Sequence, residues 1–127
     1  MTPENDAKLT ERFSFFQGAD PRESFSMFGV ECGDGWFDLL WRLCTDLELM
    51  GWQGHVTQVK EKFGELRFYI SGATEEVFNR IDEATDESHR TCETCGQPGA
   101  LDQSLYWLVT LCPTHTQERA EARKERP

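Results

Sequence analysis

Two pairs of metal-binding residues in the last third of the chain constrain its fold more than any other feature. Cys92 and Cys95 are separated by two residues, and so are Cys112 and His115, which gives the spacing C-x2-C-x16-C-x2-H. A two-residue gap lets both members of a pair reach one tetrahedral ion, and the full spacing is typical of zinc ribbons and related modules. Because four protein ligands leave no position for water or substrate, we predict one structural Zn2+ ion.

The residues around these pairs predict a zinc-binding module over residues 90–127. Residues 105–111 favour a strand, and Pro113 at a first helical position indicates a helix over residues 114–124. A knuckle, a hairpin and a helix in this order describe a treble-clef or zinc-ribbon-like arrangement. Apart from its ligands the last helix has only two alanines as apolar residues, so we expect a solvated helix.

The preceding part of the chain contains one strongly amphipathic helix. The segment 33–36 is typical of a turn that presents Asp34 as the N-cap of a helix. Apolar residues then recur at steps of four and three, which places them on one face, and Gly51 is expected to end the helix. This apolar stripe consists of Trp36, Leu40, Leu43, Leu47 and Met50.

A hairpin and a second helix are predicted to follow. Residues 55–60 and 66–71 are β-branched or aromatic runs on either side of a short charged loop, so we expect them to pair as antiparallel strands. Thr74 is suited to cap a helix whose first turn is acidic. Its inner face is predicted to consist of Val77, Ile81, Ala84 and Ser88.

The remaining residues complete an α+β body. Residues 1–33 contain apolar pairs without a sustained helical or strand period, and we predict an irregular arm that covers the core. Cys44, beside the apolar stripe, is expected to be a buried hydrophobic residue, and Cys32 an ordinary packed thiol. Together these elements predict a body over residues 1–89 that forms one cooperative unit with the zinc module.

The charge of the chain is concentrated in its first two thirds. The net charge is −10, and residues 1–89 hold 18 acids and 8 bases, whereas residues 90–127 hold 5 of each. The negative electrostatic field of such a chain repels phosphate and attracts basic protein surfaces, although the same charge is equally suited to keep a protein soluble. The lack of a long apolar segment or a secretory signal predicts a cytoplasmic protein without a membrane segment, in which the cysteines serve as ligands and free thiols.

Two groups of side chains are candidates for partner binding. Lys60, Lys62 and Arg67 form a basic island beside Phe63 at the expected hairpin tip, although lysines that guard an exposed strand edge are an equally good explanation. The second group is acidic and lies on the second helix. It consists of Glu75, Glu76, Asp82, Glu83, Asp86 and Glu87.

Three stretches of the chain have a distinctive wording. They are Glu31-Cys32-Gly33-Asp34-Gly35-Trp36, then Val59-Lys60-Glu61-Lys62-Phe63-Gly64 with Leu66-Arg67-Phe68-Tyr69, and the two zinc-ligand pairs with their neighbours. In these stretches the chain resembles a group of small uncharacterised proteins of bacteriophages, prophages and bacteria. Relatives often have a second glycine after Phe63-Gly64, where this chain has Glu65. The resemblance implies a phage-like origin, and hence the cytoplasm of a bacterial host, but it implies no activity.

These observations favour a non-enzymatic interaction factor. No Ser-His-Asp set and no phosphate-binding glycine loop is present, so we do not predict an enzyme. The leading hypothesis is a phage- or prophage-encoded protein that modulates or inhibits a host protein complex, such as a defence or nucleic-acid-handling system, by occupying a basic surface. The alternative is a nucleic-acid-binding zinc module that uses Lys60, Lys62, Phe63 and Arg67 with the last helix. The negative net charge of the chain disfavours this alternative.

Overall fold

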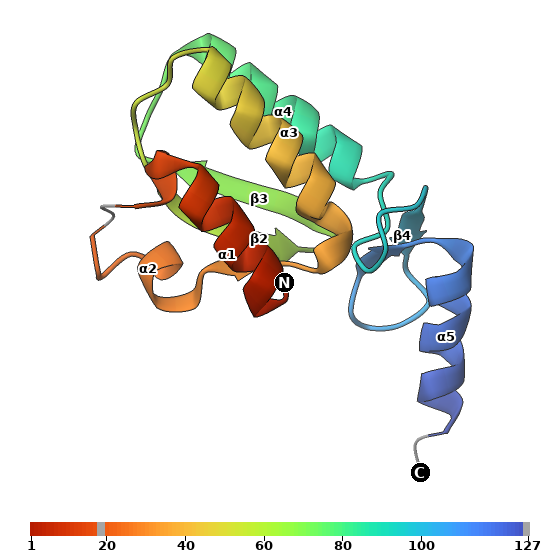
Figure 1. Ribbon diagram of the computed structural model, residues 1–127. Coiled ribbons are helices and arrows are strands. Elements are labelled where there is room, and N and C mark those ends of the chain that lie inside the picture. The colour runs from red at the N-terminus through yellow and green to blue at the C-terminus, as the bar shows by residue number, and fades with distance from the viewer. Residues whose placement is uncertain (18–19, 126–127) are drawn as a thin grey trace.

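The computed structural model describes residues 1–17 and 20–125 and has the predicted α+β composition. Helices α3 (Phe37–Leu49) and α4 (Glu75–Ser88) lie side by side with the strands of the main sheet beneath them, and α5 (Pro113–Lys124) extends from one end of the molecule (Figure 1). The other elements are α1 (Pro3–Arg12), the short 3-10 helix η1 (Ser14–Phe16), α2 (Ser24–Phe28), β1 (Val30–Glu31), the 3-10 helix η2 (Asp34–Trp36), β2 (Val56–Lys62), β3 (Glu65–Ile70), β4 (Ala100–Asp102) and β5 (Val109–Leu111).

Helix α3 carries the predicted apolar stripe at Leu40, Leu43 and Leu47, whereas Met50, expected in the stripe, follows the helix and is exposed. The helix is also not capped by Asp34. The chain makes the 3-10 turn η2 first, and α3 starts after Trp36, which gives no side-chain cap. The carboxylate of Asp34 instead accepts hydrogen bonds from the backbone N–H of Thr2 at 2.9 Å and from Nδ2 of Asn5 at 3.1 Å. Asp34 therefore fixes the start of α1 rather than the start of α3.

Strands β2 and β3 form the predicted antiparallel hairpin. Lys62 pairs with Glu65, so the loop consists of only Phe63 and Gly64, and both have positive φ angles, 55° and 80°. This is the backbone of a type I′ turn, in which a non-glycine residue at the first position is normally Asn or Asp. Phe63 thus adopts a conformation that costs energy for a bulky side chain.

Strand β2 lies in the centre of the sheet, because β1 pairs with it in parallel. Lys60 faces Glu31 on one side and Arg67 on the other, so the explanation that it guards an exposed edge is wrong. The two-residue strand β1 gave no periodic signal in the sequence. At one end of the edge strand β3, Ser88 Oγ of α4 accepts a 2.9 Å hydrogen bond from the backbone N–H of Leu66.

Helix α4 confirms the predicted cap and inner face. The Thr74 hydroxyl accepts a hydrogen bond from the N–H of Val77, and the four predicted inner residues are the buried ones. The N-terminal segment differs from the prediction, because residues 3–12 form the regular helix α1. Leu9 is the only buried residue of α1, so the helix leaves no apolar period in the sequence. The expected covering of the core is found in a cluster of buried rings that consists of Phe13, Phe15, Phe16 and Phe25.

The C-terminal part contains the antiparallel pair β4 and β5, followed by α5. The strand predicted over residues 105–111 is too long, because only residues 109–111 are extended in the sheet. Asp102 turns the chain by accepting hydrogen bonds from the N–H and hydroxyl groups of Ser104, and Arg119 donates both to Asp102 and to the carbonyl oxygen of Trp107. Helix α5 has no buried residue among those described, as its composition indicates. None of the helices in the described ranges is both long and apolar enough to cross a bilayer.

Candidate metal centre

The first ligand pair lies in a tight knuckle that leads from α4 to β4. The backbone N–H of Gly96 donates a 2.9 Å hydrogen bond to the carbonyl oxygen of Cys92, and Gly96 has a φ of 84°. Glycine adopts this conformation without steric cost, so the chain can turn directly behind Cys95. The knuckle therefore places the two sulfur atoms on the same side of the turn.

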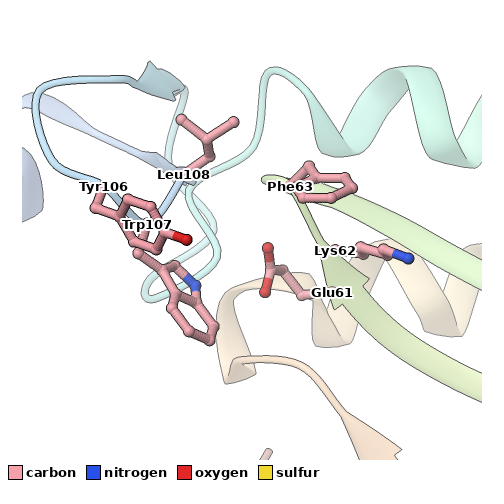
Figure 2. Close-up of a pocket in the computed structure, with 6 residues that line it drawn as sticks. All are labelled: Glu61, Lys62, Phe63, Tyr106, Trp107 and Leu108. Atoms are coloured by element: carbon pink, nitrogen blue, oxygen red, sulfur yellow. The ribbon is translucent and has the colours of Figure 1, made fainter.

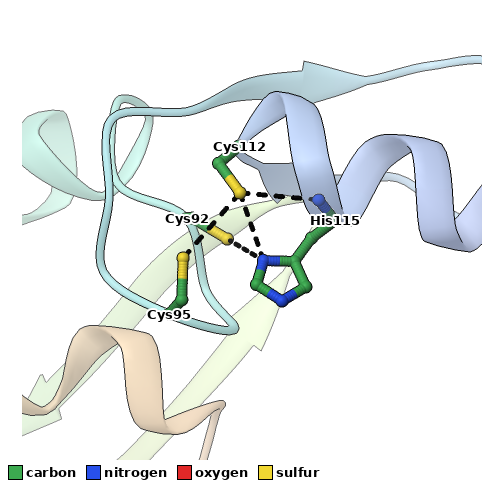
Figure 3. A group of neighbouring side chains, drawn as sticks. All are labelled: Cys92, Cys95, Cys112 and His115. Atoms are coloured by element: carbon green, nitrogen blue, oxygen red, sulfur yellow. Dashed lines mark hydrogen bonds between the residues drawn. The ribbon is translucent and has the colours of Figure 1, made fainter.

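The second pair is placed by the first turn of α5. Cys112 occupies the N-cap position, with Pro113 as the first helical residue, and its sulfur accepts from the backbone N–H of His115 at 3.5 Å. Proline suits this position because its missing N–H would have no helical partner there. The helix start thus directs the sulfur of Cys112 and the imidazole of His115 toward the knuckle (Figure 3).

The four side chains fit one tetrahedral metal ion. One ligand atom from each of Cys92, Cys95, Cys112 and His115 lies within 4.8 Å of the others. The Sγ atoms of Cys95 and Cys112 are 3.8 Å apart, and Nδ1 of His115 is 3.5 Å from the Cys92 sulfur and 3.1 Å from that of Cys112. Metal–sulfur and metal–nitrogen bonds of about 2.3 and 2.0 Å separate tetrahedral ligands by about 3.5–3.8 Å. The cluster can therefore hold one ion, with His115 contributing Nδ1.

The electrostatics of the cluster favour the ligand form of Cys92. Burial by itself raises the pKa of this thiol, but backbone N–H groups of Cys112, Cys95 and Thr94 point at the sulfur and lower the pKa to about 6. The sulfur atoms of Cys112 and Cys92 in turn raise the pKa of His115. A metal ion binds the thiolate form of cysteine, so Cys92 requires little further deprotonation at neutral pH. The backbone N–H of Gln97 lowers the pKa of Cys95, but burial and the sulfur atoms of Cys92 and Cys112 raise it overall, so this thiol must lose its proton when an ion binds.

The turn at residues 33–36 contacts the knuckle, although the two segments lie far apart in the sequence. The backbone N–H of Gly35 donates to the carbonyl oxygen of Glu93 at 2.8 Å, and that of Gly33 donates to the Glu93 carboxylate at 2.9 Å. The indole N–H of Trp36 donates to the carbonyl oxygen of Thr91 at 2.9 Å. A Cβ atom on Gly35 would lie 2.1 Å from the carbonyl oxygen of Cys92, so only glycine permits this approach.

The hairpin tip makes a second contact between the two parts of the chain. Gly64 is buried against β4 and β5, where a Cβ atom would lie 2.5 Å from Cδ1 of Leu101. The boundary between residues 89 and 90 is therefore bridged by backbone contacts at two places. Gly33 and Gly35 beside Trp36 are the sequence feature that could have indicated the first contact, because each leaves room for the knuckle backbone.

The other two cysteines lie away from the cluster, in the main core. Cys32 and Cys44 are both buried, as expected for packed thiols. Burial raises the pKa of Cys32 to about 12, and it also raises the pKa of Cys44. Neither thiol is thus suited to act as a nucleophile at neutral pH.

The candidate partner residues fall into two groups in the structure. On α4 the carboxylates of Glu75, Glu76, Asp82, Glu83 and Asp86 are exposed, whereas Glu87 is half-buried and binds Arg42 through two hydrogen bonds. In the basic island of Lys60, Lys62 and Arg67, two of the side chains already contact neighbouring residues. Arg67 forms a 2.6 Å ion pair with Glu65, and Nζ of Lys62 lies 5.3 Å from the centre of the Phe63 ring.

No family model, curated protein or solved structure matches this chain. The resemblance to small phage and bacterial proteins thus remains an expectation from the sequence.

Proposed function

We propose that the protein is a non-enzymatic interaction factor that uses an acidic surface to bind a basic surface of another protein. The observation that carries the proposal is the outer face of α4. Its five exposed carboxylates form no ion pair with any cation among residues 1–17 and 20–125, although other acids of the chain do. Glu75 and Glu76 favour the start of α4, because they lie in its first turn. Like charges four residues apart, such as Asp82 and Asp86, weaken a helix, so their accumulation needs a reason other than the fold.

The cluster of Cys92, Cys95, Cys112 and His115 supports this function as a structural site. We infer that it holds zinc and forms a treble-clef-like module, since the knuckle, the hairpin and the first turn of the following helix occur in that order. Three cysteines and a histidine fill a tetrahedral coordination shell and leave no position for a substrate. The ion would then stabilise the C-terminal part of the chain rather than take part in chemistry.

The long-range field of the chain supports an acidic mode of binding. With a net charge of −10, the protein attracts basic surfaces and accelerates association with them, and salt weakens the effect. The same field opposes nucleic acid, whose phosphates it repels. The expected phage origin and an inhibitory role have no support in the structure or in the comparisons.

The test is the capture of a basic partner by a variant that lacks the acidic face. In one variant the five exposed acids of α4 are replaced by their amides. In a control of equal net charge, five exposed acids elsewhere are replaced by glutamine, namely Glu4, Glu11, Glu31, Glu121 and Glu125. Both are immobilised, exposed to a cell lysate at several salt concentrations, and the captured proteins are identified by mass spectrometry.

We expect the parent and the control to retain the same basic protein at low salt and the α4 variant to lose it. Equal capture by both variants would contradict a role for α4. Retardation of DNA or RNA by the parent at low salt, lost as salt rises, would instead support the nucleic-acid-binding alternative.

A further inference from the structure

An open aromatic groove lies between the hairpin tip and the loop that precedes β5. It has a volume of about 460 Å³ and is lined by Glu61, Lys62, Phe63, Tyr106, Trp107 and Leu108 (Figure 2). The three rings are largely exposed, with 64% of Phe63, 99% of Tyr106 and 66% of Trp107 accessible to solvent. Exposed aromatic residues gathered in one hollow are typical of binding surfaces rather than of ordinary protein surface.

Both walls of the groove are fixed by hydrogen bonds. On one side Glu61 Oε1 accepts from the N–H of Gly64 at 2.8 Å, which closes the turn that presents Phe63. On the other side Arg119 of α5 donates to the carbonyl oxygen of Trp107 and to Asp102. The backbone that carries Phe63 and Trp107 is therefore held in place before any partner arrives, which lowers the entropic cost of binding.

The left-handed backbone conformation of Phe63 is not explained by the packing of the protein. Its φ of 55° is left-handed, and asparagine or glycine would occupy the first position of this turn with less strain. Its ring is also exposed, so Phe63 gains little from burial in return. A strained residue whose side chain is exposed points to a function in binding.

The position of the Glu61 carboxylate favours a cation in the groove. The Glu61 carboxylate lies between Phe63 and the Tyr106–Trp107 side of the groove, whereas the Lys62 side chain points away from that side (Figure 2). Lys62 already places its ammonium 5.3 Å from the Phe63 ring centre, within the range of cation–π attraction. A guanidinium group fits such a site best, because it is planar, stacks on rings and pairs with a carboxylate.

We propose that the aromatic groove binds an arginine side chain in a basic segment of a partner protein. This inference rests on the proposed function and assigns its point of contact, which acts together with the acidic face of α4. A nucleic acid strand would also offer flat groups for stacking, but its phosphates meet a chain of net charge −10. The same charge opposes a second copy of the chain as the occupant.

The experiment uses capped octa-arginine and octa-lysine peptides, which carry equal charge, and the zinc-loaded full chain. Binding is measured by calorimetry at low salt, and the indole NMR signal of Trp107 reports contact in the groove. Two variants remove the rings: Phe63→Asn, which relieves the turn, and Trp107→Ala, which keeps the backbone carbonyl that binds Arg119. The α4 amide variant described above serves as the comparison.

We expect octa-arginine to bind about tenfold more tightly than octa-lysine and to shift the Trp107 signal. Each groove variant should weaken octa-arginine binding about tenfold and bring it close to that of octa-lysine. The melting temperature of Phe63→Asn should be equal to or higher than that of the parent, which separates the loss of binding from loss of fold. The α4 variant should weaken both peptides alike.

Three results would overturn the assignment. If the peptides bound equally and neither groove variant changed their affinity, the groove would have no role in binding. The proposed acidic-surface function would then be tested only by the effect of the α4 variant. If light scattering showed a dimer that Trp107→Ala dissociates, the occupant would be a second copy. If single-stranded DNA shifted the Trp107 signal at low salt and the peptides did not, both the groove assignment and the proposed function would fail.

Discussion

The hydroxyl group of Thr110 donates a 2.6 Å hydrogen bond to the carbonyl oxygen of Gly64, and both groups are buried. This bond joins the tip of the main hairpin to strand β5, on the side of the chain that carries the metal ligands. The hairpin loop is therefore hydrogen-bonded to the part of the chain that carries the metal ligands. The contribution of this bond to the free energy of unfolding can be measured with a single substitution.

Thr110→Val should lower the free energy of unfolding by about 1–3 kcal/mol. Valine has the same shape, but it leaves the Gly64 carbonyl oxygen buried without a donor. The measurement is urea unfolding of the zinc-loaded protein. Thr57→Val, on strand β2 and half-buried, is the matched control and should change stability by less than about 0.5 kcal/mol. If the two variants unfolded at the same urea concentration, the Thr110 bond would contribute nothing.

Metal analysis should find one zinc ion per chain, and a chelator should lower the melting temperature. Metal binding and folding are coupled because the ligands converge only in the folded chain. Cys95→Ser and Cys112→Ser should each lose the ion and unfold residues 90–125, which amide exchange can follow. Cys44→Ala is the control, because Cys44 lies in the main core and should leave the zinc content at one per chain. Zinc absent from the parent, with unchanged stability in both serine variants, would contradict a structural metal site.

Gly35→Ala should destabilise the protein by about 3 kcal/mol or more and weaken zinc binding. The new methyl group would lie 2.1 Å from the carbonyl oxygen of Cys92 and 2.6 Å from backbone atoms of Glu93, and backbone cannot move aside as a flexible side chain can. Zinc affinity is measured by competition with a chromogenic chelator. Gly51→Asn provides the comparison, because no atom lies near that position and asparagine tolerates its φ of 78°. Equal zinc affinity in both variants would show that the turn at 33–36 does not support the knuckle.

The stability of the protein should depend on the ionisation of Asp34. The backbone N–H of Thr2 and the side chain of Asn5 hold the pKa of Asp34 below its ordinary value. A carboxylate with a lowered pKa stabilises the folded state above its unfolded pKa, about 3.9, and this contribution disappears as pH falls through the folded value. Asp34→Asn should therefore melt below the parent at pH 7, and the difference should shrink below about pH 4. A difference that stayed constant with pH would mean that the charge has no part in it.

The elements with a regular apolar period were predictable from the sequence. The stripe from Trp36 to Leu47, the alternating hairpin strands and the inner face of α4 each bury residues at the spacing of their own secondary structure. The spacing of the four metal-ligand candidates is similarly local, because each pair lies within one turn. Burial and close spacing are properties that a short window of sequence records.

The parts that were missed depend on contacts between distant residues. Helix α1 has one buried residue, and its start is fixed by Asp34, about 30 positions further along the chain. Strand β1 has two residues and exists because β2 lies beside it. The loop before β5 leaves the predicted strand because Arg119, from the following helix, holds the carbonyl oxygen of Trp107. None of these partners can be identified from a local pattern.

The support of the knuckle by residues 33–36 has a kinetic consequence. The hydrogen bonds from Gly33 and Trp36 to the knuckle join residues that are 60 and 55 positions apart, so they require the closure of a long loop. Each of the two ligand pairs, in contrast, lies within one turn of the chain and can reach zinc locally. Zinc capture on the nascent chain should thus be fast and reversible, and the ion should become slow to exchange only when the body has folded onto the knuckle.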